Sequence, residues 1–337
     1  MRAYGTFQQP NPYGGYLALI LPLSLAMFLA RWQRFDRWHL LICMLSGLGL
    51  ILMGAGLVMS WSRGAWLALA GGVGAVALVG VWCRAFGEIR LGILAGLAGA
   101  ALSLWWLWDT GTAKLLALPI SVLVGVGSGA LVFVSLRRRW PWLLVGMLVV
   151  LLVMALGLGG PTLLPGSVAQ RFSDVLAYLE PTDVTGVHVT DENFAVVERL
   201  AHWQAAYGMV SDHPWLGVGV GNYVPVYPAY AVPGWKDPLG HAHNYYLNMA
   251  AEAGLLGLAA YVVFLLACFR QGWSATRRLA GPSQGVALGV LGALTAFAVH
   301  SLFDNLYVQG MNMHLAMLLG LLFVLTRRRE EYFVEAS

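Results

Sequence analysis

The stretch HAHNYYLNMAAEAGLLGLAAYVVFLLACF, residues 241–269, contains the transition that decides the fold of this chain. Its first four residues end a long polar segment, whereas residues 250–269 are apolar except for Glu252. About 20 mostly apolar residues are enough for an α-helix to cross a bilayer. We therefore expect the chain to leave an aqueous loop near Tyr245 and to enter a membrane as a helix.

Composition extends this expectation to the whole chain. Hydrophobic residues make up 59% of its 337 positions and charged residues 11%, whereas a soluble domain carries roughly 25% charged residues. Apolar runs of spanning length occupy residues 14–30, 39–59, 65–83, 91–107, 115–136, 142–159, 250–269, 285–303 and 311–326. The runs are continuous and do not alternate with polar residues, which favours α-helices over β-strands. The sequence therefore predicts an all-α, polytopic transmembrane bundle of about nine spans.

The positively charged residues predict how this bundle is oriented, because the cytoplasmic connections of membrane proteins are enriched in Lys and Arg. Fourteen of the twenty such residues lie in alternate connections: Arg31, Arg34, Arg37, Arg84, Arg90, Arg137, Arg138, Arg139, Arg270, Arg277, Arg278, Arg327, Arg328 and Arg329. The other connections, which hold Arg2, Arg63, Lys114, Arg171, Arg199 and Lys236, should then face outward. This topology predicts a multi-pass protein of the plasma (inner) membrane.

Three regions follow from the topology. Residues 1–160 form six spans, residues 161–244 form one large extracytoplasmic loop, and residues 245–337 form three spans and a cytoplasmic tail. The first 13 residues must lie outside, yet no apolar helix precedes them. A short tail can cross a membrane unaided, but we expect instead that the chain begins within a longer protein.

The long loop holds eight of the acidic residues and five of the eight histidines, and loops of this length are usually functional. We expect a helix at about residues 192–211, capped by Asp191. The glycines of the GVGVG run, residues 217–221, do not have dinucleotide-binding spacing. They predict a tight turn that brings the backbone close to another element or a ligand. His243 or Asn244 should cap the helix that follows.

Two arginines are candidates for binding phosphate. Arg63 lies between two apolar runs at the expected outer edge of the membrane, and Arg199 lies on the expected loop helix. A guanidinium group binds phosphate oxygens through bidentate, charge-assisted hydrogen bonds. The alternatives are an interfacial anchor for Arg63 and a surface ion pair with Glu198 for Arg199.

His243 is the candidate general base, because a neutral imidazole can accept a proton from a hydroxyl group near pH 7. It lies two residues after His241, so the pair could also belong to a zinc site completed by His213, His202 or Glu252. A purely structural cap is a further alternative. We favour proton transfer and expect no metal and no cofactor. Asn244, Asn248 and Glu252 form a polar stripe that could orient the imidazole.

Aromatic side chains of the loop are candidates for binding sugars by stacking. They are Tyr207, Trp215, Tyr223, Tyr227, Tyr230 and Trp235. The alternative is that aromatic residues of this kind anchor the loop at the membrane interface, where Trp and Tyr are enriched.

Several motifs, taken together, resemble the O-antigen ligase family. They are YGTFQQPNP (residues 4–12), SRGAW (62–66), DHPWLGVG (212–219), HNYYL (243–247) and EAGLLG (252–257). The resemblance follows the order of the motifs along nearly the whole chain. It implies a multi-span, C-type glycosyltransferase that takes a glycan from undecaprenyl pyrophosphate at the outer face of the membrane.

The resemblance also implies roles for three residues, because Arg63, Arg199 and His243 match the family's functional residues. We further expect substrate binding by His241, Asn244, His202, Tyr223, Trp203 and Glu252. The partners would be an undecaprenyl-pyrophosphate-linked glycan as donor, a glycan or lipid-linked glycan as acceptor, and the lipid bilayer, with no nucleic acid. The expected reaction is metal-independent and inverts the anomeric carbon. A non-catalytic glycan-binding or assembly protein, or a polysaccharide transporter, is the alternative.

Overall fold

The computed structural model describes residues 3–31, 37–83, 85, 183–190 and 193–335. The ordered elements there are helices: η1 (Gly5–Phe7), α1 (Pro10–Arg31), α2 (Arg37–Ser60), α3 (Arg63–Trp82), α8 (Phe194–Asp212), α9 (Tyr223–Val226), η3 (Tyr227–Ala229), α10 (Tyr245–Arg278), α11 (Gly281–His300) and α12 (Met311–Glu335). No strand occurs within these residues. The predicted all-α class is confirmed for this part of the chain.

Four of the described helices are long and apolar enough to cross a membrane: Pro10–Ala30, Arg63–Trp82, Tyr245–Arg278 and Gly281–His300. Two shorter apolar helices, Met44–Ser60 and Met311–Arg327, accompany them. These helices indicate a multi-pass membrane protein. The expected spans at residues 91–107, 115–136 and 142–159 lie outside the described residues, so the count of nine stays a prediction.

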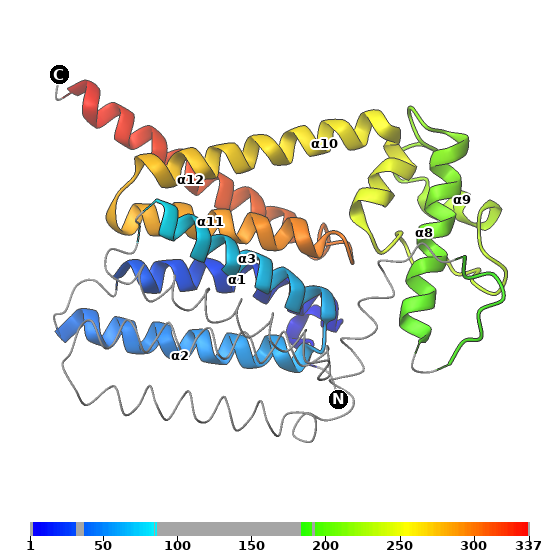
Figure 1. Ribbon diagram of the computed structural model, residues 1–337, viewed down its shortest axis with the longest axis horizontal. Helices are drawn as coiled ribbons and strands as arrows, with labels where there is room; N and C mark the ends of the chain where they lie inside the picture. The colour runs from blue at the N-terminus through cyan, green and yellow to red at the C-terminus, as the bar shows by residue number, and fades with distance from the viewer. Residues whose placement is uncertain (1–2, 32–36, 84, 86–182, 191–192, 336–337) are drawn as a thin grey trace, which may run out of the picture. The chain divides into compact units, whose positions relative to one another are not determined.

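The chain divides into two compact units, Met1–Val76 with Tyr178–Ser337, and Ala77–Ala177. Almost all of the second unit lies outside the described residues. Within the first unit, α1 packs against both α2 and α11, and α11 also packs against α10 and α12 (Figure 1). The predicted division of the chain at residues 160 and 244 stays a prediction.

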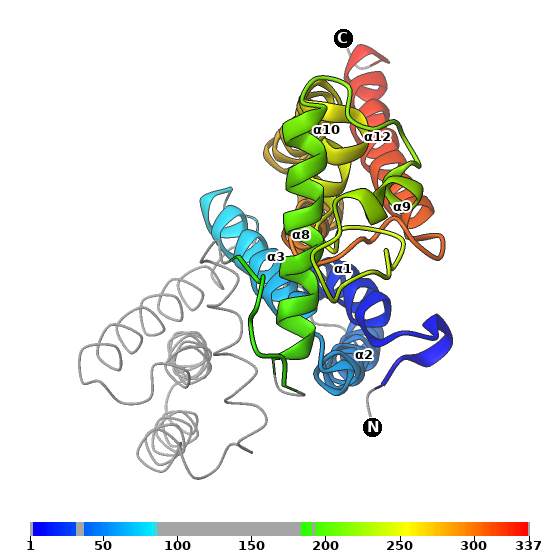
Figure 2. The ribbon, with the colours of Figure 1, turned by 90° about the vertical axis from the view of Figure 1, so that its right-hand side faces the viewer.

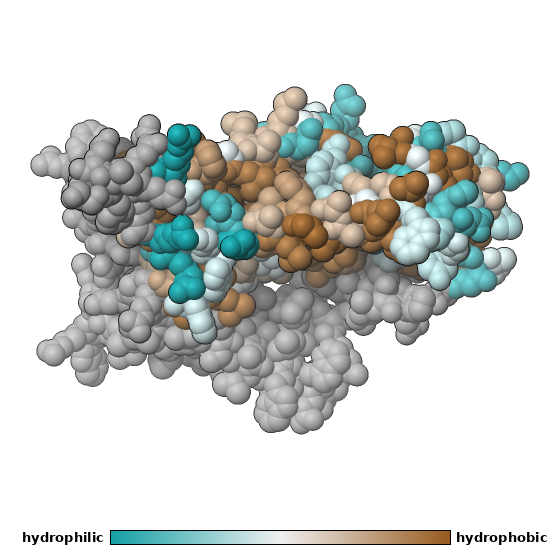
Figure 3. All heavy atoms as spheres, turned by 90° about the horizontal axis from the view of Figure 1, so that it is seen from above, coloured by the Kyte–Doolittle hydropathy of each residue, from teal (hydrophilic) through white to brown (hydrophobic). Residues whose placement is uncertain are grey.

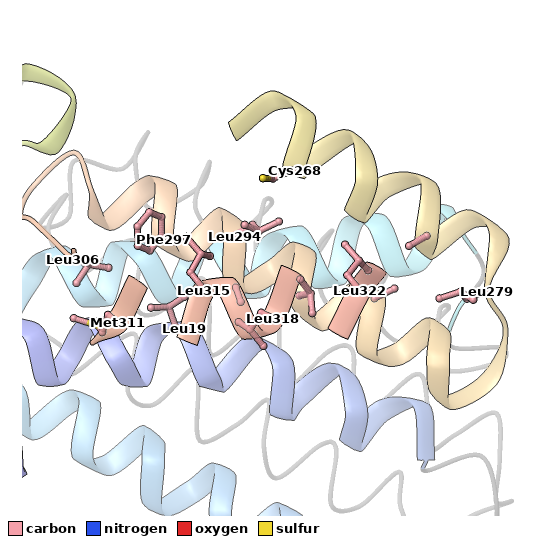
Figure 4. Close-up of a cluster of buried hydrophobic side chains, with 14 residues drawn as sticks. Leu19, Cys268, Leu279, Leu294, Phe297, Leu306, Met311, Leu315, Leu318 and Leu322 are labelled. Atoms are coloured by element: carbon pink, nitrogen blue, oxygen red, sulfur yellow. The ribbon is translucent and has the colours of Figure 1, made fainter. Parts of the chain in front are cut away.

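Side chains from α1, α10, α11 and α12 build one continuous hydrophobic core (Figure 4). Leu19 of α1, Leu294 and Phe297 of α11, and Leu315 and Leu322 of α12 are all buried in it. Because lipid is as apolar as these side chains, close packing is what favours association of the helices over contact with lipid. The core thereby holds α11 in the middle of the bundle, and with it the connection from α11 to α12.

Glycines allow three of the helices to approach closely. A Cβ atom added to Gly292 of α11 would lie 2.9 Å from the carbonyl oxygen of Gly72 on α3, and one added to Gly72 would lie 2.8 Å from the oxygen of Gly292. Pro22 of α1 meets both positions. These glycines provide the small-residue contacts that let spanning helices pack closely.

The helix α10 is bent at Gly254, where φ is 69° and ψ is −174°. Residues 245–253 and 255–278 are therefore two helical segments that meet at an angle, and Figure 1 shows the bend. The expected span at residues 250–269 runs across this bend and lies within α10, which is long and apolar enough to cross a membrane. Sequence periodicity missed the bend because both segments are helical and apolar.

The segment that follows α8 packs against the bend and forms backbone hydrogen bonds with it. The amide groups of Leu255 and Leu256 donate to the carbonyl oxygens of Pro214 (2.7 Å) and Trp215 (3.4 Å). The amides of Val218 and Gly219 donate in return to the oxygens of Ala251 and Glu252, both at 2.9 Å. Groups that would pair within an unbroken helix are paired here with the loop, so the bend leaves these four backbone groups satisfied.

Gly217 makes this exchange sterically feasible. A Cβ atom at Gly217 would lie 2.5 Å from the carbonyl oxygen of Ala251, and one at Gly254 would lie 2.2 Å from that of Trp215. The prediction that the glycine run brings the backbone close to another element is confirmed, and that element is α10.

Candidate functional site

Two connections between helices meet at the end of the bundle that lies against α8, and they form the candidate site. Residues 241–244 lead into α10, and residues 301–310 lead from α11 to α12. The amide of Tyr245 donates to the carbonyl oxygen of Ser301 at 2.8 Å, which fixes the two connections side by side. Figure 2, which looks at this end, shows α8 in front of the spanning helices.

Asn244 caps α10; the sequence had predicted either His243 or Asn244 as the cap. Its side-chain oxygen accepts hydrogen bonds from the amides of Tyr246 (3.0 Å) and Leu247 (3.1 Å). The preceding residue, His243, has a left-handed backbone with φ of 52°. This conformation turns the chain just before the helix and sets the direction of the His243 side chain.

His243 faces a carboxylate that the sequence analysis did not select. Nδ1 of His243 lies 3.4 Å from Oδ1 of Asp304, and Nε2 of His241 lies 3.8 Å from the same oxygen. The other oxygen of Asp304 accepts a hydrogen bond of 2.9 Å from the side-chain amide of Asn11, on α1. Nε2 of His243 is buried and has no hydrogen-bond partner among the residues that the structure describes. The imidazole therefore has one nitrogen held by Asp304 and one buried nitrogen that makes no hydrogen bond within the described residues.

The local charges keep Asp304 ionised. Burial alone would raise the pKa of Asp304, but the hydrogen bond from His243 and the charges of Arg199, His243 and His241 outweigh it, so the pKa is lowered. For His241, burial is the main cause that lowers the pKa to about 4, although Asp304 acts in the opposite direction. At neutral pH the site thus combines an ionised carboxylate with a neutral His241.

His202 approaches this group from α8. Its ring lies 5.6 Å from that of His243 and stacks on Tyr227 at 4.8 Å, and its Nδ1 lies 3.1 Å from the hydroxyl group of Tyr223. Burial, with the charges of His243 and His241, lowers the pKa of His202 to about 4. Tyr223 is fully buried, so the structure places it beneath His202 and not on the surface as a stacking platform.

Arg199 also comes from α8 (Phe194–Asp212), which confirms the helix predicted at about residues 192–211. The expected cap, Asp191, lies outside the described residues, and Asn193 holds the N-cap position. The positive charge of Arg199 contributes to the lowered pKa of both Asp304 and His241. The predicted loop arginine and the predicted histidines are therefore brought together. Trp203 follows Arg199 one helical turn later and is partly buried.

Arg63 is the first residue of α3 and is partly buried. A Cβ atom at its neighbour Gly64 would lie 3.1 Å from Cβ of Phe303 and 3.8 Å from Nε2 of His300. Arg63 is therefore carried by a helix end that lies against the same connection as Asp304. His300 is buried there as well, and neither of its ring nitrogens has a hydrogen-bond partner within the described part of the chain.

Two residues of the polar stripe of α10, Asn248 and Glu252, hold the backbone of neighbouring loop segments in place. The side-chain oxygen of Asn248 accepts from the amide of Ala242 at 3.1 Å, and that of Glu252 accepts from the amide of Tyr223 at 3.1 Å. Within the described residues, neither side chain makes a hydrogen bond to an imidazole. These two residues fix the segments that carry His241, His243 and Tyr223.

One ligand atom each from His241, His243 and Asp304 lies within 4.8 Å of the others, so these residues could also hold a metal ion. His213, which the sequence offered as a further ligand, is exposed at the end of α8. Asp304 was missed because it follows an apolar run at a distance of 61 residues from His243. Asp304 could have been selected from its position, because it is a single carboxylate at the expected outer end of a span.

Comparison with protein families supports the resemblance. The family model described as O-antigen ligase matches residues 115–262, a segment that includes Arg199, His202, His241 and His243. The predicted resemblance to the O-antigen ligase family is confirmed by this match. No curated protein matches the chain. Arg63 and Asp304 lie outside the matched segment and are brought to it by the fold.

Proposed function

We propose that this chain is a membrane glycosyltransferase of the O-antigen ligase and polymerase type. It would transfer a glycan from undecaprenyl pyrophosphate to the hydroxyl group of an acceptor glycan or lipid-linked glycan, at the outer face of the plasma membrane. The match of residues 115–262 to the O-antigen ligase family and the spanning helices support a membrane enzyme of this class. The observation that carries the chemistry is the pair His243 and Asp304.

His243 would act as the general base. Asp304 accepts a hydrogen bond from Nδ1 of His243, so the proton resides on that nitrogen and Nε2 keeps its lone pair. The acceptor hydroxyl attacks the anomeric carbon while its proton passes to Nε2. The bond from that carbon to the phosphate oxygen breaks, and the polyprenyl pyrophosphate leaves with the electron pair. A single displacement of this kind inverts the anomeric carbon.

Arg63 and Arg199 would stabilise the leaving pyrophosphate, because charge develops on its oxygens as the bond breaks. The two arginines come from separate elements, α3 and α8, and can therefore approach a diphosphate from two sides. His241, His202 and Trp203 would line the sugar side of the site. Asn244, Glu252 and Tyr223 would support the site without lining it. Asn244 caps α10, Glu252 accepts a hydrogen bond from the loop backbone at Tyr223, and the hydroxyl group of Tyr223 contacts His202.

The replacement His243→Asn tests the general base. Asn tolerates a left-handed backbone, so this variant preserves the turn at φ of 52° while it removes the basic nitrogen. We expect the rate of transfer by the purified full-length protein from a lipid-linked glycan to fall by ~100-fold or more. His188→Asn, at an exposed position in the same loop, is the control and should transfer normally. Full transfer by His243→Asn would remove His243 from the mechanism.

Chelation separates proton transfer from metal chemistry at the same residues. Because arginines and an imidazole supply the charges in this mechanism, transfer should be unchanged after treatment of the protein with a strong zinc chelator. Loss of transfer that added zinc restores would instead assign His241, His243 and Asp304 to a metal site.

A further inference from the structure

The segment after α8 ends in an exposed apolar tip, which we define as residues 214–220. Trp215 is 66% exposed, Leu216 is 74% exposed and Val220 is 82% exposed. The tip contains no charged residue. Large apolar side chains in such a group on a protein surface indicate an interaction site.

The apolar tip is continuous with the lipid-facing surface of α10. Its carbonyl groups at Pro214 and Trp215 pair with the amides of Leu255 and Leu256, the first residues after the bend. Leu255 and Leu256 are themselves 43% and 56% exposed. Further along the same helix the exposed side chains are again apolar: Val262, Val263, Phe264 and Leu266. Figure 3, which looks down on this face, shows hydrophobic residues along it.

The length of the span sets the depth of the tip. The apolar part of α10 after the bend, residues 255–269, ends before Arg270 and rises about 22 Å as a helix, which is shorter than the roughly 30 Å of hydrocarbon in a bilayer. With Arg270 at the cytoplasmic interface, Leu255 and Leu256 lie no farther out than the opposite lipid interface, and the tip lies beside them. Trp is enriched at this level because its ring is apolar and its N–H group reaches water.

The backbone of the tip suits an environment with little water. The oxygens of Pro214 and Trp215 are paired with α10, and the amides of Gly217, Val218 and Gly219 donate to the oxygens of His213, Ala251 and Glu252. Unpaired backbone groups are costly in lipid, and these five groups are paired although the segment is neither helix nor strand.

We propose that the apolar tip inserts into the lipid interface of the leaflet that α10 enters, and that it anchors the loop to the bilayer. The tip is joined to the C-terminal end of α8, so the anchor fixes the height of α8 above the membrane. Arg199 and His202, both on α8, are thereby held at the level of lipid headgroups. The proposal concerns lipid binding and does not depend on the proposed transfer reaction.

Site-directed spin labelling of the full-length protein in phosphatidylglycerol and phosphatidylcholine vesicles tests the anchor. Cys43, Cys83 and Cys268 are first replaced by Ala, and a nitroxide is attached at Leu216→Cys. The matched control is Val224→Cys, an exposed apolar position on α9, which lies farther from the spanning helices than the bend does (Figure 1).

The readout is the collision rate of each nitroxide with oxygen, which concentrates in lipid, and with a water-soluble nickel complex. We expect the ratio of the two rates to be several-fold higher at position 216 than at position 224. Equal ratios would show that the tip lies in water. A label at position 216 that neither reagent reaches would show that protein covers the tip. Either result would overturn the proposal, and circular dichroism confirms that both labelled proteins are folded.

Discussion

Asp304 decides which nitrogen of His243 is available. It is buried, its Oδ2 is held by Asn11, and its Oδ1 also accepts from the amide of Asn305 at 2.9 Å. A carboxylate fixed in this way can hold the imidazole in one tautomer and stabilise the imidazolium that forms during proton transfer. In the proposed mechanism Asp304 therefore acts through His243 and does not contact the acceptor.

The substitution Asp304→Asn should lower the rate constant for transfer by between ~10-fold and ~10⁴-fold, the upper value being that of the same change in a Ser-His-Asp triad. The apparent affinity for the lipid-linked donor should change little, because Asp304 orients the base and does not bind the diphosphate. Steady-state kinetics measure both quantities. Asp183→Asn, at an exposed loop carboxylate that bonds Thr185 and Gln204, should behave as wild type. A loss confined to donor affinity would contradict the orienting role.

The buried imidazoles predict how the stability of the loop depends on pH. His202 and His241 have pKa values lowered from 6.5 to about 4 by burial, so the unfolded loop binds more protons than the folded loop between these values. Stability is therefore fully present above pH 6.5 and is lost as the pH falls towards 4, by roughly 3 kcal/mol for each imidazole. Asp304 does not counteract this loss, since its lowered pKa affects stability only below about pH 4.

Hydrogen exchange of α8 at pH 7 and pH 5 measures this effect. After correction for the intrinsic pH dependence of exchange, the amides of α8 should be less protected at pH 5. In His202→Asn the difference between the two pH values should shrink, because one of the two imidazoles is gone. Equal protection of the wild-type loop at both values would contradict the prediction.

At the scale of elements, the bend of α10 joins the loop to the bundle. It divides one apolar helix into a spanning segment and a short segment that carries Asn248 and Glu252 towards the loop. The exchange of hydrogen bonds with residues 214–219 makes α8 and α10 one structural unit. The bend thus determines where the loop residues stand relative to the end of the bundle.

Gly254→Ala should break this connection. The backbone at Gly254 has a conformation that costs other residues about 1–3 kcal/mol, and a Cβ atom there would also meet the carbonyl of Trp215 at 2.2 Å. Exchange of the amides of Val218 and Gly219 should accelerate by about 10-fold to 100-fold or more. Gly320→Ala is the control, because Gly320 is in α12 and nothing lies within 4 Å of its added Cβ. Unchanged exchange in Gly254→Ala would show that the bend does not depend on glycine.

At the scale of the whole molecule, the described part of the chain combines spanning helices with a folded loop across their end. Polar and ionisable groups gather at that end, and the apolar spans pack through leucines and glycines. Such an arrangement suits the proposed transfer, in which a lipid-linked donor and an acceptor glycan would meet at the membrane interface.

The outward orientation of the loop is tested by labelling intact cells. In a protein without its native cysteines, Tyr207→Cys at an exposed position of α8 should react with a membrane-impermeant maleimide. Ala280→Cys, exposed between α10 and α11, should react only after the membrane is permeabilised, because the positive-inside rule places that connection in the cytoplasm. The reverse pattern would contradict the proposed orientation and, with it, the proposed donor.

The sequence alone predicted the membrane class, the helical fold and a helix cap at either His243 or Asn244. It also selected the four loop or loop-edge residues Arg199, His202, His241 and His243. Each of these depends on local composition, spacing or a shared motif, which are visible along the chain. Asp304, Asn11 and the bend at Gly254 were decided by tertiary structure. Asp304 and His243 are 61 positions apart, and Asn11 and Asp304 are 293 apart, so only the packing of α1, α10 and α11 brings them into contact. The bend is stable because its backbone groups form hydrogen bonds with residues 214–219. The sequence around Gly254 does not show which distant residues will form those bonds.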